Sequence, residues 1–179
     1  MRKLPVIIAV AAISGGGKTT IAKQLNQKLE NVKTLYFDNY NFEGPDDIIN
    51  WLDRGANYEE WNLAPLVKDL EILLSESLDY IVLDYPFAYK HTNMSKFINI
   101  AVFIDTPLDI AMARRITRDF KNKSVDDILS EMTNYTAQGR RGYIEMLKTI
   151  KPDSDIVIDG TLAVFETVNK ILQSINSST

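Results

Sequence analysis

A run of seven residues near the N-terminus contains the groups needed to hold a chain of phosphates. It joins three glycines, a lysine and three hydroxyl residues: Ser14, Gly15, Gly16, Gly17, Lys18, Thr19 and Thr20. Glycines let the backbone curl so that several N–H groups point inward toward an anion. The positive end of a following helix, the Lys18 ammonium and the Thr19 hydroxyl would complete a site for phosphates and Mg²⁺. The run therefore predicts a loop that binds ATP with Mg²⁺.

One position departs from the usual form of this loop, G-x-x-x-x-G-K-[S/T]. Ala12 stands where the first glycine is expected. The position falls at the end of an apolar run rather than in the phosphate cradle, so we expect the loop to form. The alternative is a glycine-rich turn with an accidental lysine.

Two aspartates follow apolar, strand-like runs and could take part in phosphoryl transfer. Asp38 ends the second run and Asp84 the third, and ligands of open α/β folds gather at that edge of the sheet. We assign Asp38 to orienting the acceptor hydroxyl and accepting its proton, and Asp84 to holding Mg²⁺. Either aspartate could instead cap a turn.

Arginines gather late in the chain. Arg114, Arg115 and Arg118 are spaced three and four apart, so a helix would place them on one side. Arg140 and Arg141 follow, between two glycines. We predict that residues 114–142 form a lid that closes over ATP and stabilises the transferring phosphoryl group. The alternative is a solvated helix face paired with neighbouring aspartates.

Five strand-like runs alternate with segments of helical periodicity, which predicts an α/β fold with a parallel sheet. The runs are 6–12, 34–37, 80–83, 100–104 and 155–158. Helices are expected at 17–30, 45–54, 63–76 and, interrupted, 125–150. Another should begin with Thr106 as its N-cap and Pro107 as its first helical residue.

Composition limits the remaining choices. The chain has 179 residues, of which 45% are hydrophobic, which suits a single domain spanning 1–179. Its net charge of −4 argues against a nucleic-acid partner. Since His91 is the single histidine and cysteine is absent, any metal should be held by oxygen ligands.

The first residues imitate a secretory signal, because Arg2 and Lys3 precede an apolar run. A buried parallel strand explains the same run and fits the glycines that follow it. No apolar run is long enough to cross a bilayer. We therefore expect a cytoplasmic protein without a membrane partner, and the sequence leaves its oligomeric state open, a homo-oligomer included.

The class of phosphate-loop protein can be narrowed further. GTPases carry an Asn-Lys-x-Asp motif that recognises the nucleotide base, and the segment Asn122-Lys123-Ser124-Val125 does not match it. A short chain with late arginines favours a kinase that phosphorylates a hydroxyl of a small molecule.

The chain resembles the uridine kinase and phosphoribulokinase branch of the phosphate-loop kinases along most of its length. The similar segments are Phe37-Asp38-Asn39-Tyr40, Asn41-Phe42-Glu43-Gly44-Pro45-Asp46, Val82-Leu83-Asp84-Tyr85, Phe103-Ile104-Asp105, Arg114-Arg115-Ile116-Thr117-Arg118-Asp119 and Ser154-Asp155-Ile156-Val157-Ile158. The resemblance implies a five-stranded parallel sheet, with Asp38 as the base and the three arginines in the ATP lid.

The acceptor segment departs from this family. Glu43 occupies the position of the family's ribose-binding aspartate, and Gly44 occupies the position of the histidine next to it. The substrate-binding residues that we predict are Asp38, Tyr40, Glu43 and Asp46. Four aromatic residues could line a pocket for a base or sugar, or pack in the core instead: Tyr40, Trp51, Tyr58 and Trp61.

Two other functions stay open on the sequence alone. A nucleotide-binding regulatory module with weakened catalysis would explain Ala12 and the altered acceptor segment. A kinase of nucleic-acid ends would need a basic groove, which the acidic balance disfavours.

Overall fold

A five-stranded sheet forms the centre of the protein. The computed structural model describes residues 4–178, and its strands are β1 (Val6–Ala11), β2 (Val32–Tyr36), β3 (Tyr80–Asp84), β4 (Ile100–Asp105) and β5 (Ile156–Asp159). They are all parallel, in the order β2-β3-β1-β4-β5. The predicted α/β fold with five parallel strands is confirmed. Strand ends differ from the predicted ends by one or two residues, because pairing with the neighbouring strand, rather than apolar character, sets them.

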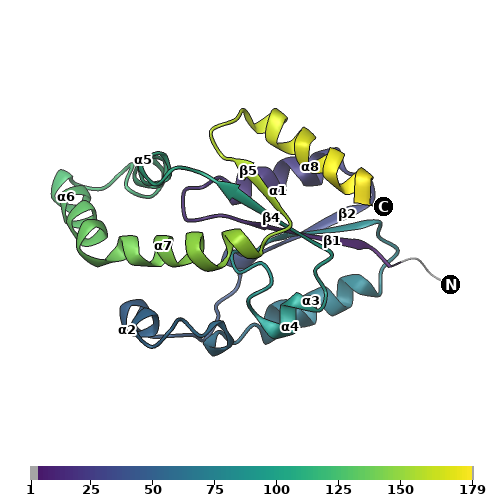
Figure 1. Cartoon of the computed structure of the whole chain (residues 1–179), viewed down its shortest axis with the longest axis horizontal. Helices are drawn as coiled ribbons and strands as arrows, with labels where there is room; N and C mark the ends of the chain where they lie inside the picture. The colour runs from purple at the N-terminus through teal and green to yellow at the C-terminus, as the bar shows by residue number, and fades with distance from the viewer. Residues whose placement is uncertain (1–3, 179) are drawn as a thin grey trace.

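Helices cover both faces of the sheet (Figure 1). On one face, α1 (Lys18–Lys28) and α8 (Val164–Ser178) pack over Ile8 and Val10 of β1. On the other face, α3 (Ala64–Leu74) packs near Ile7 and Ala9. Successive residues of a strand point to opposite faces, so a strand buried on both sides is apolar throughout. This explains the apolar run of β1. Arg2 and Lys3, which raised the signal-peptide alternative, lie outside the described residues.

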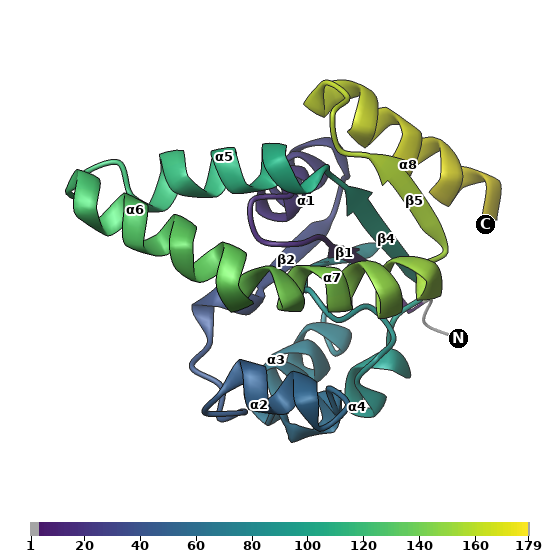
Figure 2. The same ribbon diagram turned by 60° about the vertical axis from the view of Figure 1, so that its left-hand side comes forward.

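A helical arm, residues 108–149, extends beyond the sheet and returns to it (Figure 2). It consists of α5 (Leu108–Asp119), α6 (Val125–Asn134), a π-helical turn η3 (Tyr135–Gly139) and α7 (Arg140–Thr149). Ser124 and Asp127 form a reciprocal capping box at the start of α6. The predicted helical region 125–150 is therefore two helices joined through a π turn.

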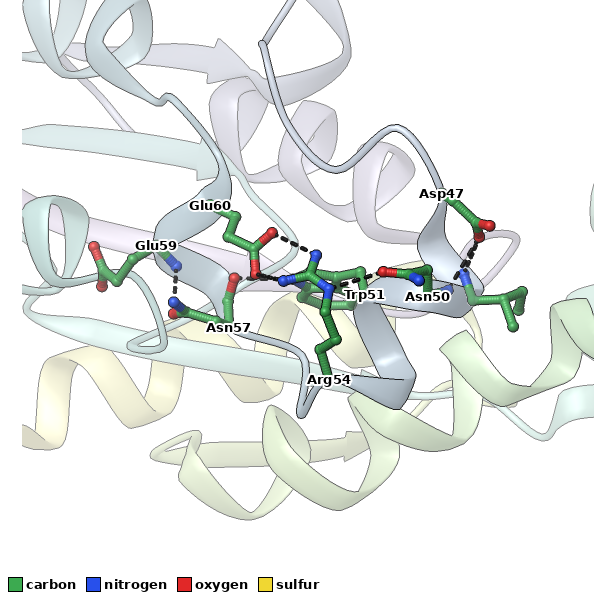
Figure 3. Close-up of polar contacts among 8 residues, drawn as sticks. Asp47, Asn50, Trp51, Arg54, Asn57, Glu59 and Glu60 are labelled. Atoms are coloured by element: carbon green, nitrogen blue, oxygen red, sulfur yellow. Dashed lines mark hydrogen bonds and ion pairs between the residues drawn. The ribbon is translucent and has the colours of Figure 1, made fainter.

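The segment between β2 and α3 is held together by its own polar groups (Figure 3). Its helix α2 (Ile48–Asp53) is shorter than predicted, because Asp47 caps it by accepting from the N–H groups of Ile49 and Asn50. Arg54 donates two hydrogen bonds to Glu60, at 3.0 and 2.9 Å. The segment also contains the 3₁₀ turns η1 (Phe37–Asn39) and η2 (Tyr58–Glu60).

Two short elements complete the fold, α4 (Thr92–Ser95) and the 3₁₀ turn η4 (Lys151–Asp153). Among residues 4–178, none of the helices combines the length and the apolarity needed to span a bilayer.

Candidate active site

The loop between β1 and α1 has the backbone conformation that its glycines permit. Gly15 and Gly17 have φ values of +80° and +100°, in the region that L side chains avoid. The N–H of Gly16 donates to the carbonyl of Ile13 at 2.8 Å and closes a tight turn. Gly17 is the N-cap of α1, so Lys18 begins the helix. The free N–H groups of the first helical turn therefore face the loop.

Close packing adds a second reason for these glycines. A Cβ on Gly15 would lie 2.0 Å from the carbonyl oxygen of Ala111 in α5. A Cβ on Gly16 would lie 2.8 Å from the Cβ of Ala12. Ala12 itself is 2% exposed and packs in the core beneath α1. The alanine at the usual glycine position is thus accommodated because Gly16 leaves room for its methyl group.

Lys18 of the phosphate loop forms an ion pair with Asp84. Asp84 is the last residue of β3, is 1% exposed, and lies opposite Val10 of β1 in the sheet. The parallel pairing of β1 and β3 therefore brings the carboxylate to the phosphate loop. A carboxylate beside an ammonium suits a metal ion bound next to a phosphate, since the carboxylate would bind Mg²⁺ and the ammonium would bind the phosphate.

Asp38 lies on η1, directly after β2, and lines the same cavity as the phosphate loop. This cavity has a volume of about 470 Å³. Beyond residues 12–20, its lining consists of Phe37, Asp38, Pro86, Arg114, Arg118 and Met146.

Arg114 and Arg118 reach the cavity from α5. Arg114 donates to the carbonyl of Gly160, at 3.3 and 3.4 Å. Arg118 donates to the carboxylate of Asp119 at 2.6 and 2.9 Å. These bonds with Asp119 raise the pKa of Arg118 and outweigh its partial burial, and the nearby charge of Asp38 raises it further. Two cations thus face the cavity on the side of the arm.

Arg115 does not join this pair, contrary to the expectation that all three arginines share one side. Its guanidinium lies 2.6 Å from Glu131 of α6 and links the two helices of the arm. Burial lowers the pKa of Arg115, but Tyr143 and Glu131 outweigh it, so the pKa is raised. The predicted contact of Arg115 with ATP therefore has no support in this geometry.

Arg140 and Arg141 also lie away from the phosphate loop. They line a separate hollow of about 400 Å³, together with Leu52 of α2 and Lys148. Arg141 forms an ion pair with Asp53. The π turn before these two arginines explains why they lie toward α2 and away from the phosphate loop. One extra residue in a helical turn rotates the following helix by roughly 100°.

Three predicted substrate residues do not line the cavity. The Tyr40 hydroxyl donates to Asp69 at 2.8 Å, and burial, followed by this contact with Asp69, raises the pKa of Tyr40. Glu43 accepts from the side chain of Asn62 at 3.3 Å. Asp46 is exposed, near the start of α2. Of the aromatic residues proposed for a pocket, Trp51 and Tyr58 are buried in the core and meet edge to face.

Thr106 has a different role from the one the sequence indicated. The helix α5 begins at Leu108 with Pro107 at its cap, and Thr106 makes no cap bond to it. Instead the buried Thr106 hydroxyl donates to the carbonyl of Gly16 at 2.8 Å. No local pattern signals this contact, since the two residues are 90 positions apart.

A smaller hollow of about 240 Å³ lies on the other side of Arg114. Its lining includes Gly17 and Thr20 of the loop region and, after β5, Gly160 and Leu162. The residues after β5 carry no sequence pattern that marks them as part of a site.

The side chains present fit Mg²⁺ bound together with a nucleotide. Among residues 4–178, no group of three or more His, Cys, Asp or Glu side chains is arranged to hold a metal by itself. Thr19 lines the cavity, whereas the buried Asp84 is paired with Lys18 and is not among the lining residues; these two would supply the protein ligands. Mg²⁺ in such sites takes its remaining ligands from phosphate oxygens and water.

Comparison with known proteins finds uridine kinases similar in sequence to this chain, although no protein-family model matches it. The uridine kinase of Anoxybacillus flavithermus is 26% identical over 188 residues, which cover 88% of this chain and 87% of the relative. The uridine kinase of Streptococcus mutans serotype c is 25% identical over 211 residues and the full length of both chains.

Solved structures share the fold at lower identity. Shikimate kinase from Aquifex aeolicus has a TM-score of 0.54 and 17% identity, covering 97% of this chain and 98% of its own. A gluconokinase from Sinorhizobium meliloti 1021 has a TM-score of 0.57 and 16% identity, covering 98% and 94%. The chain therefore has the fold of the phosphate-loop small-molecule kinases. Within that class, its sequence is uridine kinase-like.

Proposed function

We propose that this protein transfers the γ-phosphoryl group of ATP, with Mg²⁺, to a hydroxyl of a small metabolite. The observation that carries the proposal is the convergence of Lys18, Asp38, Arg114 and Arg118 on one cavity beside the phosphate loop. Phosphoryl transfer needs little covalent participation from the protein, and depends on positioning and on neutralisation of charge. The proposed acceptors are nucleosides, as for the uridine kinases that the chain resembles, pantothenate-like alcohols, and sugars.

Each residue has a defined task in this proposal. The loop amides and Lys18 bind the phosphates, and Arg114 and Arg118 stabilise the charge of the transferring group. Asp38 orients the acceptor hydroxyl and accepts its proton. Mg²⁺, when bound by Thr19 and Asp84, supplies further neutralisation of phosphate charge.

The smaller hollow behind Arg114 is our candidate for the nucleotide base. It borders the phosphate loop at Gly17 and Thr20. Its remaining lining includes apolar side chains such as Leu162 and Val164, which suit a flat heterocycle. We further propose that residues 1–179 act as one kinase domain in the cytoplasm, with 114–142 as its lid.

Two measurements test the proposal. Calorimetry should detect binding of Mg-ATP, and labelled ATP offered with a panel of hydroxyl compounds should yield a phosphorylated product. Lys18→Ala should weaken nucleotide binding and abolish turnover. Asp38→Asn should bind Mg-ATP normally and lower kcat by about 10²–10⁴-fold, the usual contribution of a general base. An Asp38→Asn protein with undiminished turnover would remove Asp38 from the mechanism.

The second candidate function is a nucleotide-binding regulatory module. It is favoured by the positions of Tyr40 and Glu43, which contact Asp69 and Asn62 rather than the cavity. Binding of Mg-ATP without phosphorylation of any acceptor would favour the module. Phosphoryl transfer above background hydrolysis, lost in Asp38→Asn, would favour the kinase.

A further inference from the structure

We assign to the acceptor the part of the cavity that is lined by three apolar side chains from outside the phosphate loop and α5. Phe37 comes from η1, Pro86 from the loop after β3, and Met146 from α7. Asp38 lies beside Phe37 and is the one carboxylate among the residues that line the cavity in the described part of the chain. The cations, Lys18, Arg114 and Arg118, come from the phosphate loop and α5.

Polar groups that could bind a sugar diol are engaged elsewhere. Tyr40 donates to Asp69 and Glu43 accepts from Asn62. The following segment uses its polar side chains internally, as Figure 3 shows for Arg54 with Glu60 and for the caps of α2. These side chains are therefore not placed to replace the hydrogen bonds to water that a polyhydroxylated acceptor gives up on entering the cavity.

The aromatic side chains near the acceptor side pack against one another. The ring of Phe37 contacts Phe42 at a centroid distance of 4.6 Å and Phe87 at 5.3 Å. The ring of Trp61 covers Gly44, where an added Cβ would lie 2.7 Å from the Trp61 ring. Trp61 thus takes the space that a side chain at position 44 would need, and it does not line the cavity.

Met146 reaches the cavity because of the register of α7. The π turn η3 precedes this helix and turns Arg140 and Arg141 toward α2. Met146, further along α7, is one of the residues that line the cavity, and it also packs against the core on that face of the sheet. A methionine supplies an adaptable apolar surface without a directional polar contact.

We infer that Met146, Phe37 and Pro86 select the acceptor, and that the acceptor is an alcohol whose carbon skeleton next to the reacting hydroxyl is alkyl rather than a ribose or another polyol. The inference rests on the proposed kinase function and names its substrate class. The alkyl skeleton packs on the apolar wall, and its hydroxyl lies against Asp38.

The reaction balances with these residues. The alcohol oxygen forms a bond to the γ-phosphorus of ATP. The bond from that phosphorus to the β,γ-bridging oxygen breaks, and its electron pair leaves with ADP. The hydroxyl proton passes to Asp38 and then to solvent.

The test compares three groups of acceptors with labelled Mg-ATP and the full-length protein. The alkyl alcohols are pantothenate, mevalonate and isopentenol, the nucleosides are uridine and cytidine, and the polyols are ribose, gluconate and glycerol. We expect kcat/KM for at least one alkyl alcohol to exceed that for every nucleoside and polyol by about tenfold or more, the size of effect that apolar pockets give. Equal or better turnover of uridine or a polyol would overturn the inference while leaving the kinase function intact.

Variants of Met146 test the role of the apolar side chains that line the cavity. Met146→Gln should raise KM for the preferred alcohol about tenfold, while the Kd for Mg-ATP stays the same. Met146→Leu should retain most of the activity, because it keeps the apolar surface. Met132→Gln is the matched control, since Met132 is exposed on α6 and lies outside the cavity. An unchanged acceptor KM in Met146→Gln counts against the inference.

The remaining outcomes separate the two proposals. Binding of Mg-ATP with no turnover of any compound in the three groups would overturn the acceptor class and favour the regulatory module. Absence of Mg-ATP binding by folded protein would overturn the kinase function itself.

Discussion

The hydroxyl of Thr106 donates a 2.8 Å hydrogen bond to the carbonyl oxygen of Gly16, which joins the end of β4 to the phosphate loop. This hydrogen bond is buried. Gly160 packs closely on the same threonine, since a Cβ on Gly160 would lie 1.9 Å from the Thr106 hydroxyl oxygen. Arg114 in turn donates to the Gly160 carbonyl. The phosphate loop, the end of β4 and the turn after β5 are therefore positioned together.

Replacement of Thr106 by valine should loosen the phosphate loop. Valine preserves the side-chain shape but leaves the buried Gly16 carbonyl without this donor, which should cost about 1–3 kcal/mol of stability. The Kd for Mg-ATP should increase as well, because the loop is less well positioned. Urea denaturation and calorimetry check the two effects. Thr106→Ser keeps the hydroxyl and should show a smaller effect on nucleotide binding. Equal nucleotide affinity in Thr106→Val and wild type would separate this hydrogen bond from function.

The buried pair of Lys18 and Asp84 allows stability to be separated from activity. Lys18→Met should lower the free energy of unfolding by about 3–5 kcal/mol at pH 7, because Asp84 then keeps a buried charge without its partner. The double variant Lys18→Met with Asp84→Asn should recover much of that loss and stay inactive. Urea denaturation and phosphoryl-transfer assays give the two readouts. A single variant as stable as wild type would mean that the pair is not energetically coupled.

The arginines of α5 should divide into two groups. Arg114→Ala and Arg118→Ala should each lower kcat by about 10²-fold, because both side chains face the phosphate cavity. Arg115→Ala should mainly lower stability, by about 1 kcal/mol, since it removes the ion pair with Glu131. Steady-state kinetics and thermal unfolding of the three variants distinguish these roles. A loss of kcat in Arg115→Ala as large as in Arg114→Ala would place Arg115 at the nucleotide, as the sequence alone suggested.

Much of the fold could be predicted because it depends on local signals. The apolar run of β1 and the glycines after it specify a buried strand and a tight loop, and the pairing of β1 with β3 then brings Asp84 to that loop. These features need knowledge only of periodicity and of parallel-sheet topology.

The directions of side chains could not be predicted in the same way. Arg140 and Arg141 face α2 because a π turn shifts the helix, and helical periodicity assumes that no such turn is present. The side-chain directions of Tyr40 and Glu43 are set by hydrogen bonds with Asp69 and Asn62, residues that are distant in the sequence. The apolar role of Met146 was missed because a single methionine in a polar helix carries no pattern that marks it as part of a site.

Glu59 provides a prediction about pH. One of its carboxylate oxygens accepts from both the hydroxyl and the backbone N–H of Thr92, each at 2.6 Å, and so connects η2 to α4. The hydroxyl of Thr92, then its N–H, lowers the pKa of Glu59 below its ordinary value of 4.5. A carboxylate with a lowered pKa stabilises the fold above its unfolded pKa, and this contribution is lost as the pH falls through the lowered value.

Glu59→Gln should therefore destabilise the protein at neutral pH and make no difference in acid. The glutamine keeps an acceptor oxygen for Thr92 but lacks the charge. Because the Glu59 side chain is 42% exposed, solvent screening reduces the expected cost to about 0.5–1 kcal/mol at pH 7. Urea denaturation of both proteins at pH 7, 5.5 and 3.5 measures the difference, which should shrink as the pH falls through the lowered pKa of Glu59. A difference of the same size at all three values would show that packing, rather than the charge of Glu59, stabilises the contact with Thr92.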